Sequence, residues 1–268
     1  MIEILDPGIY STIQDLGRWG FQKYGVPVSG VMDEVSARLA NILVGNTENA
    51  ALIEFYVRGP TIKFHTSTYF VVGGDAILSL NNKEIMSWTR YRANVGDILK
   101  ISRLRSGAYG YVAFFGGINT ESILGSRATY VRAKMGKKLE AGDILPIGTN
   151  FLRYKSPRLN YIPESLWPKY SNKAEVRVIL GPNEDHFTEN GIKTFLSSWY
   201  TVSLESDRMG YRLEGPRIEH SNLGPDIITD AVPLGSIQVP GNGLPIIMLA
   251  DRQTTGGYAK IGVVIRVD

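Results

Sequence analysis

The stretch Tyr69-Phe70-Val71-Val72-Gly73-Gly74-Asp75-Ala76-Ile77-Leu78-Ser79-Leu80-Asn81-Asn82 decides the fold class. It holds two short runs rich in β-branched, aromatic or aliphatic residues, and each run ends in a turn signal of Gly, Asp or Asn. Such runs are typical of β-strands joined by tight turns. The stretch therefore predicts two short strands.

The same pattern recurs along the whole chain, over residues 98–101, 109–115, 176–180, 246–250 and 262–265. Many short strands with closely spaced turns favour antiparallel sandwiches or barrels. The regular alternation of strands with long helices that a parallel α/β sheet requires is missing. We therefore expect a mostly β protein.

Two segments break the strand pattern and predict helices. Residues 33–44 place apolar side chains at helical spacing and are followed by Gly45, a frequent helix stop. The segment after Thr188 also has apolar residues at helical spacing, and Thr188 is a suitable N-cap. A few short helices should therefore accompany the strands.

The length of the chain, 268 residues, favours about two domains. Pro157, Pro163 and Pro168 interrupt a stretch rich in Tyr, Lys and Arg, which is typical of an inter-domain connection. We place an N-terminal β domain over residues 1–155, a connecting segment over 156–174 and a C-terminal β domain over 175–268.

Composition excludes several classes of function. The chain has no cysteine, which excludes a thiolate nucleophile and a zinc–thiolate site, and its three histidines are widely spaced, so we expect no metal site. A net charge of +3 does not indicate a nucleic-acid partner. The N-terminus lacks signal-peptide features and no apolar run approaches the ~18 residues of a membrane span, so we expect a cytoplasmic protein with no membrane partner. Basic residues gather between 90 and 138, either as an anion-facing surface or as solvated strand faces.

The densest polar cluster is Asp251-Arg252-Gln253-Thr254-Thr255-Gly256-Gly257-Tyr258, which follows the apolar run at 246–250. A carboxylate, a guanidinium, an amide and two hydroxyls stand on five adjacent residues, and two glycines then allow close approach of the backbone to a ligand. The alternative is a polar hairpin that caps its own turn. We favour a functional cluster lining the principal cleft, with Arg252 as an exposed residue that binds a developing anion.

Two further polar runs have structural and functional interpretations. Arg208 could make bidentate contacts to a carboxylate or phosphate, or form salt bridges with Asp207 and Glu205. Gln14, Asp15 and Arg18 lie in a loop punctuated by glycines, either as ligand contacts or as a turn held by its own ion pair.

Several of these segments carry a resemblance to a known family. The runs include Gln14-Asp15-Leu16-Gly17-Arg18, Gly25-Val26-Pro27-Val28-Ser29-Gly30, Ser206-Asp207-Arg208-Met209-Gly210-Tyr211, Gly235-Ser236-Ile237-Gln238-Val239-Pro240 and Asp251-Arg252-Gln253-Thr254-Thr255-Gly256-Gly257-Tyr258. In this order they resemble the family of 5-oxoprolinase C subunits, also called the second subunit of urea carboxylase or allophanate hydrolase, which includes a Kip-type kinase regulator. The resemblance extends over almost the whole chain.

The resemblance implies two cyclophilin-like β-barrel halves and partners in a hetero-oligomer. The partners would be a sister subunit of the 5-oxoprolinase B type and a lactam-utilisation subunit of the A type. It also implies ATP with magnesium in the complex, or biotin on a partner in the alternative. On this basis we predict catalytic roles for Arg208, Asp251, Arg252 and Gln253. Substrate binding is predicted for Gln14, Asp15, Arg18, Gln238, Thr254, Thr255, Gly256, Gly257 and Tyr258.

Three functions follow from this resemblance. The first is a subunit of an ATP-dependent 5-oxoprolinase, which opens 5-oxo-L-proline to L-glutamate. The second is the carboxyltransferase component of a biotin-dependent urea or amide carboxylase, and the third is a non-catalytic Kip-type regulatory protein. One segment, residues 128–139, departs from the family pattern in being shorter and more basic, so its effect on substrate choice is open.

Overall fold

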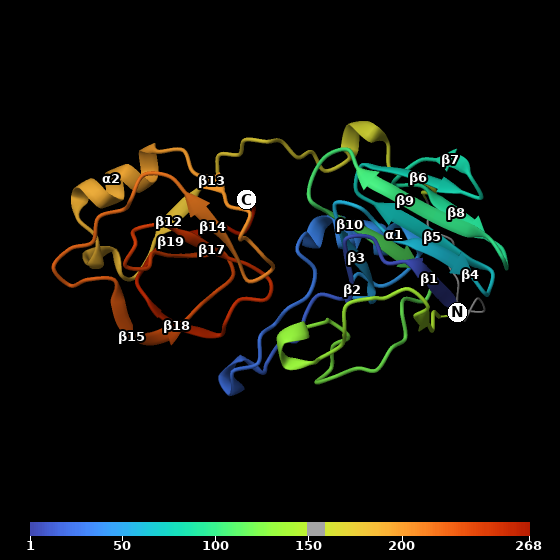
Figure 1. Cartoon of the computed structure of the whole chain (residues 1–268), viewed down its shortest axis with the longest axis horizontal. Helices are drawn as coiled ribbons and strands as arrows, with labels where there is room; N and C mark the ends of the chain where they lie inside the picture. Colours follow the sequence, from blue (N-terminus) through green and yellow to red (C-terminus); the bar gives the residue numbers. More distant parts are fainter. Residues whose placement is uncertain (149–158) are drawn as a thin grey trace. The chain divides into compact units, whose positions relative to one another are not determined.

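The computed structural model describes residues 1–148 and 159–268, and this part of the chain forms two compact units (Figure 1). Unit 1 comprises Met1–Arg18 and Gly30–Asn172, and unit 2 comprises Trp19–Ser29 and Lys173–Asp268. Strands dominate both units, so the expected mostly β fold is confirmed. The domain boundaries at 155 and 175 stay a prediction, and residues 149–158 around the first of them lie outside the described residues.

Unit 1 contains two antiparallel sheets, with strand orders β11-β1-β4-β9-β6-β7 and β2-β3-β10-β5-β8. The elements of unit 1 are β1 Ile2–Asp6, β2 Tyr10–Gln14, α1 Glu34–Val44, β3 Leu52–Tyr56, β4 Thr61–Phe64, β5 Thr68–Gly73, β6 Ala76–Leu80, β7 Lys83–Ile85, β8 Arg90–Ala93, β9 Ile98–Leu104, β10 Tyr109–Phe114, η2 Val131–Ala133, β11 Ile144–Leu145 and η4 Glu164–Leu166. Residues 69–82 form most of β5 and all of β6, as predicted.

The main core of unit 1 is built from the apolar faces of both sheets. In β9, Leu99 and Ile101 are buried while Lys100 between them is exposed, because successive side chains of a strand point to opposite faces. Ile62 of β4 and Val112 of β10 belong to the same cluster of buried residues. The alternation in the sequence therefore specifies which face of each strand enters the core.

Helix α1 covers the other face of the second sheet and has both predicted ends. The carboxylate of Asp33 accepts a hydrogen bond from the backbone N–H of Ser36 at 3.0 Å, and Gly45 ends the helix with a φ of 95°. Ala40 of the helix packs in a second buried cluster with Trp88. The predicted helix is thus confirmed.

Residues 159–172 are tied to unit 1 by backbone and side-chain contacts. The N–H of Ile162 donates to the carbonyl of Trp88 at 2.8 Å. Farther along, the Tyr170 hydroxyl lies 2.9 Å from Ser36 Oγ and donates to the Asp33 carboxylate. Burial and then the hydrogen bond to Asp33 raise the pKa of Tyr170, so this phenol stays protonated.

Unit 2 is also β-rich, with a six-stranded sheet in the order β12-β19-β16-β17-β14-β13 and a two-stranded sheet of β15 and β18 (Figure 1). Its elements are η1 Gln22–Tyr24, β12 Val178–Leu180, η5 Glu184–His186, α2 Glu189–Ser197, β13 Thr201–Val202, β14 Gly210–Glu214, β15 Asp226–Ala231, β16 Ser236–Gln238, β17 Ile246–Met248, β18 Thr255–Tyr258 and β19 Lys260–Val264. The Thr188 hydroxyl accepts from the N–H of Gly191 at 2.9 Å, which confirms the predicted cap of α2.

The apolar core of unit 2 is smaller than that of unit 1. Its fully buried members are Phe187, Ile218, Ile237, Val239, Ala259 and Ile261. Beside this core the same unit buries several charged or amide side chains. Among the described residues, no helix has the length and apolar character that crossing a membrane requires.

Candidate functional site

Four polar side chains lie together in unit 2. Gln238 of β16 stands opposite Lys260 of β19 in the antiparallel sheet. The Lys260 ammonium lies 3.1 Å from Asp230 Oδ2 on β15, and Gln253 Nε2 lies 3.4 Å from Gln238 Oε1. We call Gln238, Gln253, Lys260 and Asp230 the Lys260 cluster. It combines two of the residues predicted from sequence with two that were not.

Gly256 lets the two amides of the Lys260 cluster come close to the backbone. A Cβ at this position would stand 2.5 Å from Gln238 Nε2 and 2.8 Å from Gln253 Nε2, so any side chain would push the amides away. Gly256 pairs with Asp230 across β18 and β15. The neighbouring Gly257 has more space, with no atom nearer than 3.7 Å to its Cβ position. Gly256 was predicted to allow the backbone to approach a ligand closely. In the structure it makes room for the side chains of Gln238 and Gln253.

Arg208 and Asp251 form a buried, bidentate ion pair. Arg208 Nε donates to Asp251 Oδ2 at 2.9 Å and Arg208 Nη2 donates to Oδ1 at 3.2 Å. The two side chains are only 8% and 12% exposed. The structure shows Arg208 in a salt bridge with Asp251, a partner that differs from the Asp207 and Glu205 named in the sequence interpretation. The catalytic roles of these two residues stay a prediction.

Arg252 is buried, so the expectation of an exposed cleft residue is wrong. Its exposed fraction is 9%, its Nε donates to the carbonyl of Val232 at 2.9 Å and its Nη1 to that of Leu249 at 3.2 Å. Burial lowers the pKa of the guanidinium. The density of polar residues predicted a functional role for Arg252. In the structure its side chain reaches inward to backbone carbonyls that need donors.

The hydroxyl residues of the predicted cluster face different environments. Thr254 is half-buried, and its carbonyl accepts a hydrogen bond from the N–H of Val232 at 3.0 Å. Thr255 and Tyr258 are exposed. The Tyr258 carbonyl, rather than its hydroxyl, meets the Lys260 cluster, where it lies 3.5 Å from Gln238 Nε2.

The predicted residues of unit 1 are buried and bind mainly the backbone. Asp15 accepts hydrogen bonds from the N–H groups of Gly17 and Arg127 and from the Ser126 hydroxyl, at 2.7 to 2.9 Å. Arg18 donates to the carbonyls of Ile123 and Ala128, at 2.8 and 2.9 Å, and Gln14 donates to the Thr12 hydroxyl and the Thr129 carbonyl. These contacts hold residues 123–129 to the first loop of the chain.

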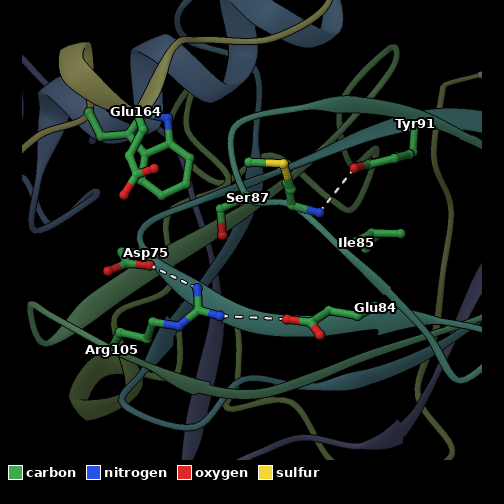
Figure 2. Close-up of a pocket in the computed structure, with 9 residues that line it drawn as sticks. Asp75, Glu84, Ile85, Ser87, Tyr91, Arg105 and Glu164 are labelled. Carbon is green, nitrogen blue, oxygen red and sulfur yellow. Dashed lines mark hydrogen bonds and ion pairs between the residues drawn. The ribbon is translucent and has the colours of Figure 1, made fainter.

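A pocket of about 420 Å³ also lies in unit 1, and none of the predicted residues lines it (Figure 2). Arg105 lies 3.2 Å from Asp75 and 3.6 Å from Glu84 (Figure 2). Glu164 and Trp167 of the connecting segment also line the pocket. The Glu84 and Arg105 side chains are 77% and 48% exposed. The charges of this pocket are partly neutralised by one another and open to water, which weakens their attraction for a charged ligand.

Comparison with known proteins assigns the family. The family of the carboxyltransferase domain, subdomain A and B, matches residues 24–268. The chain belongs to this family. It is 35% identical to the 5-oxoprolinase C subunit of Haemophilus influenzae, covering 100% of this chain and 85% of that protein. The corresponding protein of Escherichia coli is 32% identical, with 86% of its length covered.

Longer proteins contain a similar carboxyltransferase domain. Urea amidolyase of Lachancea kluyveri is 37% identical over 98% of this chain, which covers 16% of that enzyme. The crystal structure of Kluyveromyces lactis urea amidolyase has a TM-score of 0.91 at 31% identity, with 99% of this chain and 17% of that chain covered. The crystal structure of TTHA0988 has a TM-score of 0.89 and is 30% identical over all of this chain. This chain covers about half, 52%, of the TTHA0988 chain.

Sequence reasoning missed Lys260 and Asp230 of this carboxyltransferase domain. A signal for Lys260 was present, because it interrupts an apolar run between Ala259 and Ile261. A lysine there must either face solvent or be buried with a partner. Among the described residues, no group of three or more His, Cys, Asp or Glu side chains is arranged to hold a metal ion.

Proposed function

We propose that this chain is the C-type subunit of an ATP-dependent 5-oxoprolinase, which opens 5-oxo-L-proline to L-glutamate. The observation that carries the proposal is the similarity along all of this chain to two 5-oxoprolinase C subunits, which are 35% and 32% identical to it. The urea amidolyases, at a similar identity, support a second function.

The Lys260 cluster supplies the chemistry that opening a lactam requires. A lactam oxygen gains negative charge when its carbon is attacked, and fixed hydrogen-bond donors at that oxygen stabilise the transition state. Gln238 is buried and Gln253 is half-buried, so their amide donors act in surroundings that contain little water. We assign the lactam oxygen to these two amides, which Gly256 allows to approach the backbone.

ATP supplies the phosphoryl group that activates the lactam oxygen in this proposal. In balance, 5-oxo-L-proline, ATP and two water molecules give L-glutamate, ADP and phosphate, with the ring C–N bond broken and its nitrogen becoming the amine. The sequence contains no Gly-x4-Gly-Lys-Ser/Thr loop, so no residue of this chain is assigned to the nucleotide. The nucleotide and its magnesium ion are assigned to the partner subunits, of the B and A types.

A second function, carboxyl transfer from biotin to urea or another amide, is favoured by the urea amidolyase relatives. The same two amides would then stabilise the ureido oxygen of biotin, carried by a partner, as its carboxyl group leaves. The residue types therefore suit both reactions, and the reconstitution below separates them.

The test is reconstitution with the two candidate partner subunits encoded in the same genome. We expect L-glutamate and ADP to form at equal rates from 5-oxo-L-proline and ATP, and only when this chain is present. Glutamate formation that does not depend on this chain would refute the proposal. ATP-dependent carboxylation of urea, with a biotin carboxylase and carrier in place of the partners, would establish the second function instead.

A further inference from the structure

Lys260 is a lysine in an unusual position. Its side chain is 3% exposed although it begins β19 of a small unit, and lysines are almost never fully buried unless they are paired. Its neighbours Ala259 and Ile261 belong to the apolar core of unit 2. The ammonium is therefore held at a fixed place by a rigid strand, in surroundings where an unpaired charge is costly.

The partner of Lys260 is an exposed carboxylate. Asp230 Oδ2 lies 3.1 Å from the ammonium, and the Asp230 side chain is 60% exposed. Asp230 belongs to β15, which pairs with β18 alone and so forms an edge of its two-stranded sheet (Figure 1). The pair is thus asymmetric, with a cation fixed inside the unit and an anion that water can reach. Of the two groups, the carboxylate is the one that another anion can replace.

The donor groups of the Lys260 cluster make few contacts. Among the described residues, its ammonium, Gln238 Nε2 and Gln253 Nε2 each donate to a single acceptor, at 3.1, 3.5 and 3.4 Å. An ammonium has three hydrogens and a primary amide two, so donors remain available beside the cation. The two amide contacts are long for hydrogen bonds. A fixed cation in one cluster with two primary amides suits an oxygen-rich anion.

We propose that Lys260 binds the carboxylate of the substrate, and that Asp230 occupies the place of this carboxylate in the free protein. The Asp230 contact shows that a carboxylate fits against the ammonium. The inference rests on the proposed function, because 5-oxo-L-proline carries one carboxylate beside its lactam. It adds that Lys260 selects substrates with that group, while Gln238 and Gln253 face the lactam oxygen.

The experiment uses the enzyme reconstituted with its partner subunits. Two substrates are compared, 5-oxo-L-proline and 2-pyrrolidinone, which is the same lactam ring without the carboxylate. Lys260→Met keeps the length of the side chain and removes its charge, and should raise the KM for 5-oxo-L-proline roughly 10- to 100-fold. The preference for 5-oxo-L-proline over 2-pyrrolidinone in equilibrium binding should fall by a similar factor. Asp230→Asn should lower the KM for 5-oxo-L-proline several-fold, because a competing anion is removed.

Two controls separate binding from folding. Lys193→Met removes an exposed lysine of α2 in the same unit and should leave both substrates unaffected. Melting temperatures show whether the Lys260→Met variant folds. If that variant does not fold, Asp230→Asn, which changes an exposed position, tests the proposal in its place. Equilibrium binding of 5-oxo-L-proline and 2-pyrrolidinone to each complex gives a measurement that does not require turnover.

The outcomes distinguish this inference from the proposed function. Suppose that the wild-type complex hydrolyses 5-oxo-L-proline, and that the Lys260→Met complex has the wild-type KM and still prefers the substrate with the carboxylate. The inference is then wrong and the proposed function stands. If the complex does not hydrolyse 5-oxo-L-proline but binds it through Lys260, the function is wrong and the carboxylate site stands. A KM raised by Asp230→Asn, or no binding of 5-oxo-L-proline, would also overturn the inference.

Discussion

The polar residues around Asp15 in unit 1 and the Lys260 cluster in unit 2 use similar side chains in different ways. Asp15 receives three hydrogen bonds of 2.7 to 2.9 Å, two of them from backbone N–H groups. In the Lys260 cluster the amide contacts are 3.4 and 3.5 Å long, and the cation is paired with an exposed carboxylate. The Asp15 carboxylate is held by short contacts within the chain, whereas the contacts of the Lys260 cluster are long enough to shorten around a ligand.

This difference separates support of the fold from binding. Short hydrogen bonds to the backbone fix a loop, and breaking them leaves buried groups without partners. Long contacts are common at catalytic sites without ligand and shorten when the substrate binds. Although both sets contain residues predicted to bind substrate, we infer that the Lys260 cluster binds it and that Asp15 and Arg18 hold residues 123–129 in place.

The largest effect on stability is expected from the ion pair of unit 2. Asp251→Ala leaves the Arg208 guanidinium buried without its carboxylate and should lower the free energy of unfolding by about 3–5 kcal/mol. Urea denaturation would measure it. The matched control is Arg177→Ala. It breaks the ion pair between Asp268 and the exposed Arg177, and should change the free energy of unfolding little. Equal losses in the two variants would show that burial does not set the effect.

A smaller effect is expected at the helix caps of the two units. Thr188→Ala removes the hydrogen bond to Gly191 and should cost unit 2 about 1 kcal/mol. Asp33→Ala in unit 1 should cost more, about 2 kcal/mol, because the other carboxylate oxygen accepts the Tyr170 hydroxyl. Thermal unfolding of both variants checks the order. The reverse order would mean that Tyr170 contributes nothing to holding residues 159–172.

Local features of the fold were predictable from the sequence. The strands within residues 69–80, the stop of α1 at Gly45 and the cap of α2 at Thr188 depend on a few neighbouring residues, and the structure confirms them. The direction of long polar side chains was not predictable, because it depends on partners far along the chain. Arg252 reaches Val232, 20 residues away, and Lys260 reaches Asp230 across 30 residues.

The predicted site shows the same limit. Gln238 and Gln253, 15 residues apart, were both predicted and do meet. Arg252, the expected anion-binding residue of an exposed cleft, is buried against backbone carbonyls. Polar density therefore points to a part of the chain, but packing decides which of its residues can contact a ligand.

The most direct test of the account compares Gln253→Ala with Asp15→Ala in the reconstituted enzyme. Turnover of 5-oxo-L-proline and melting temperature are measured on both variants. Gln253→Ala should lower turnover by roughly 10²-fold or more with little change in melting temperature, the scale seen when one fixed donor is lost. Asp15→Ala should lower the melting temperature and leave turnover per folded molecule near that of the wild type. Near-normal turnover in Gln253→Ala, together with lost turnover in a stably folded Asp15→Ala, would contradict the account.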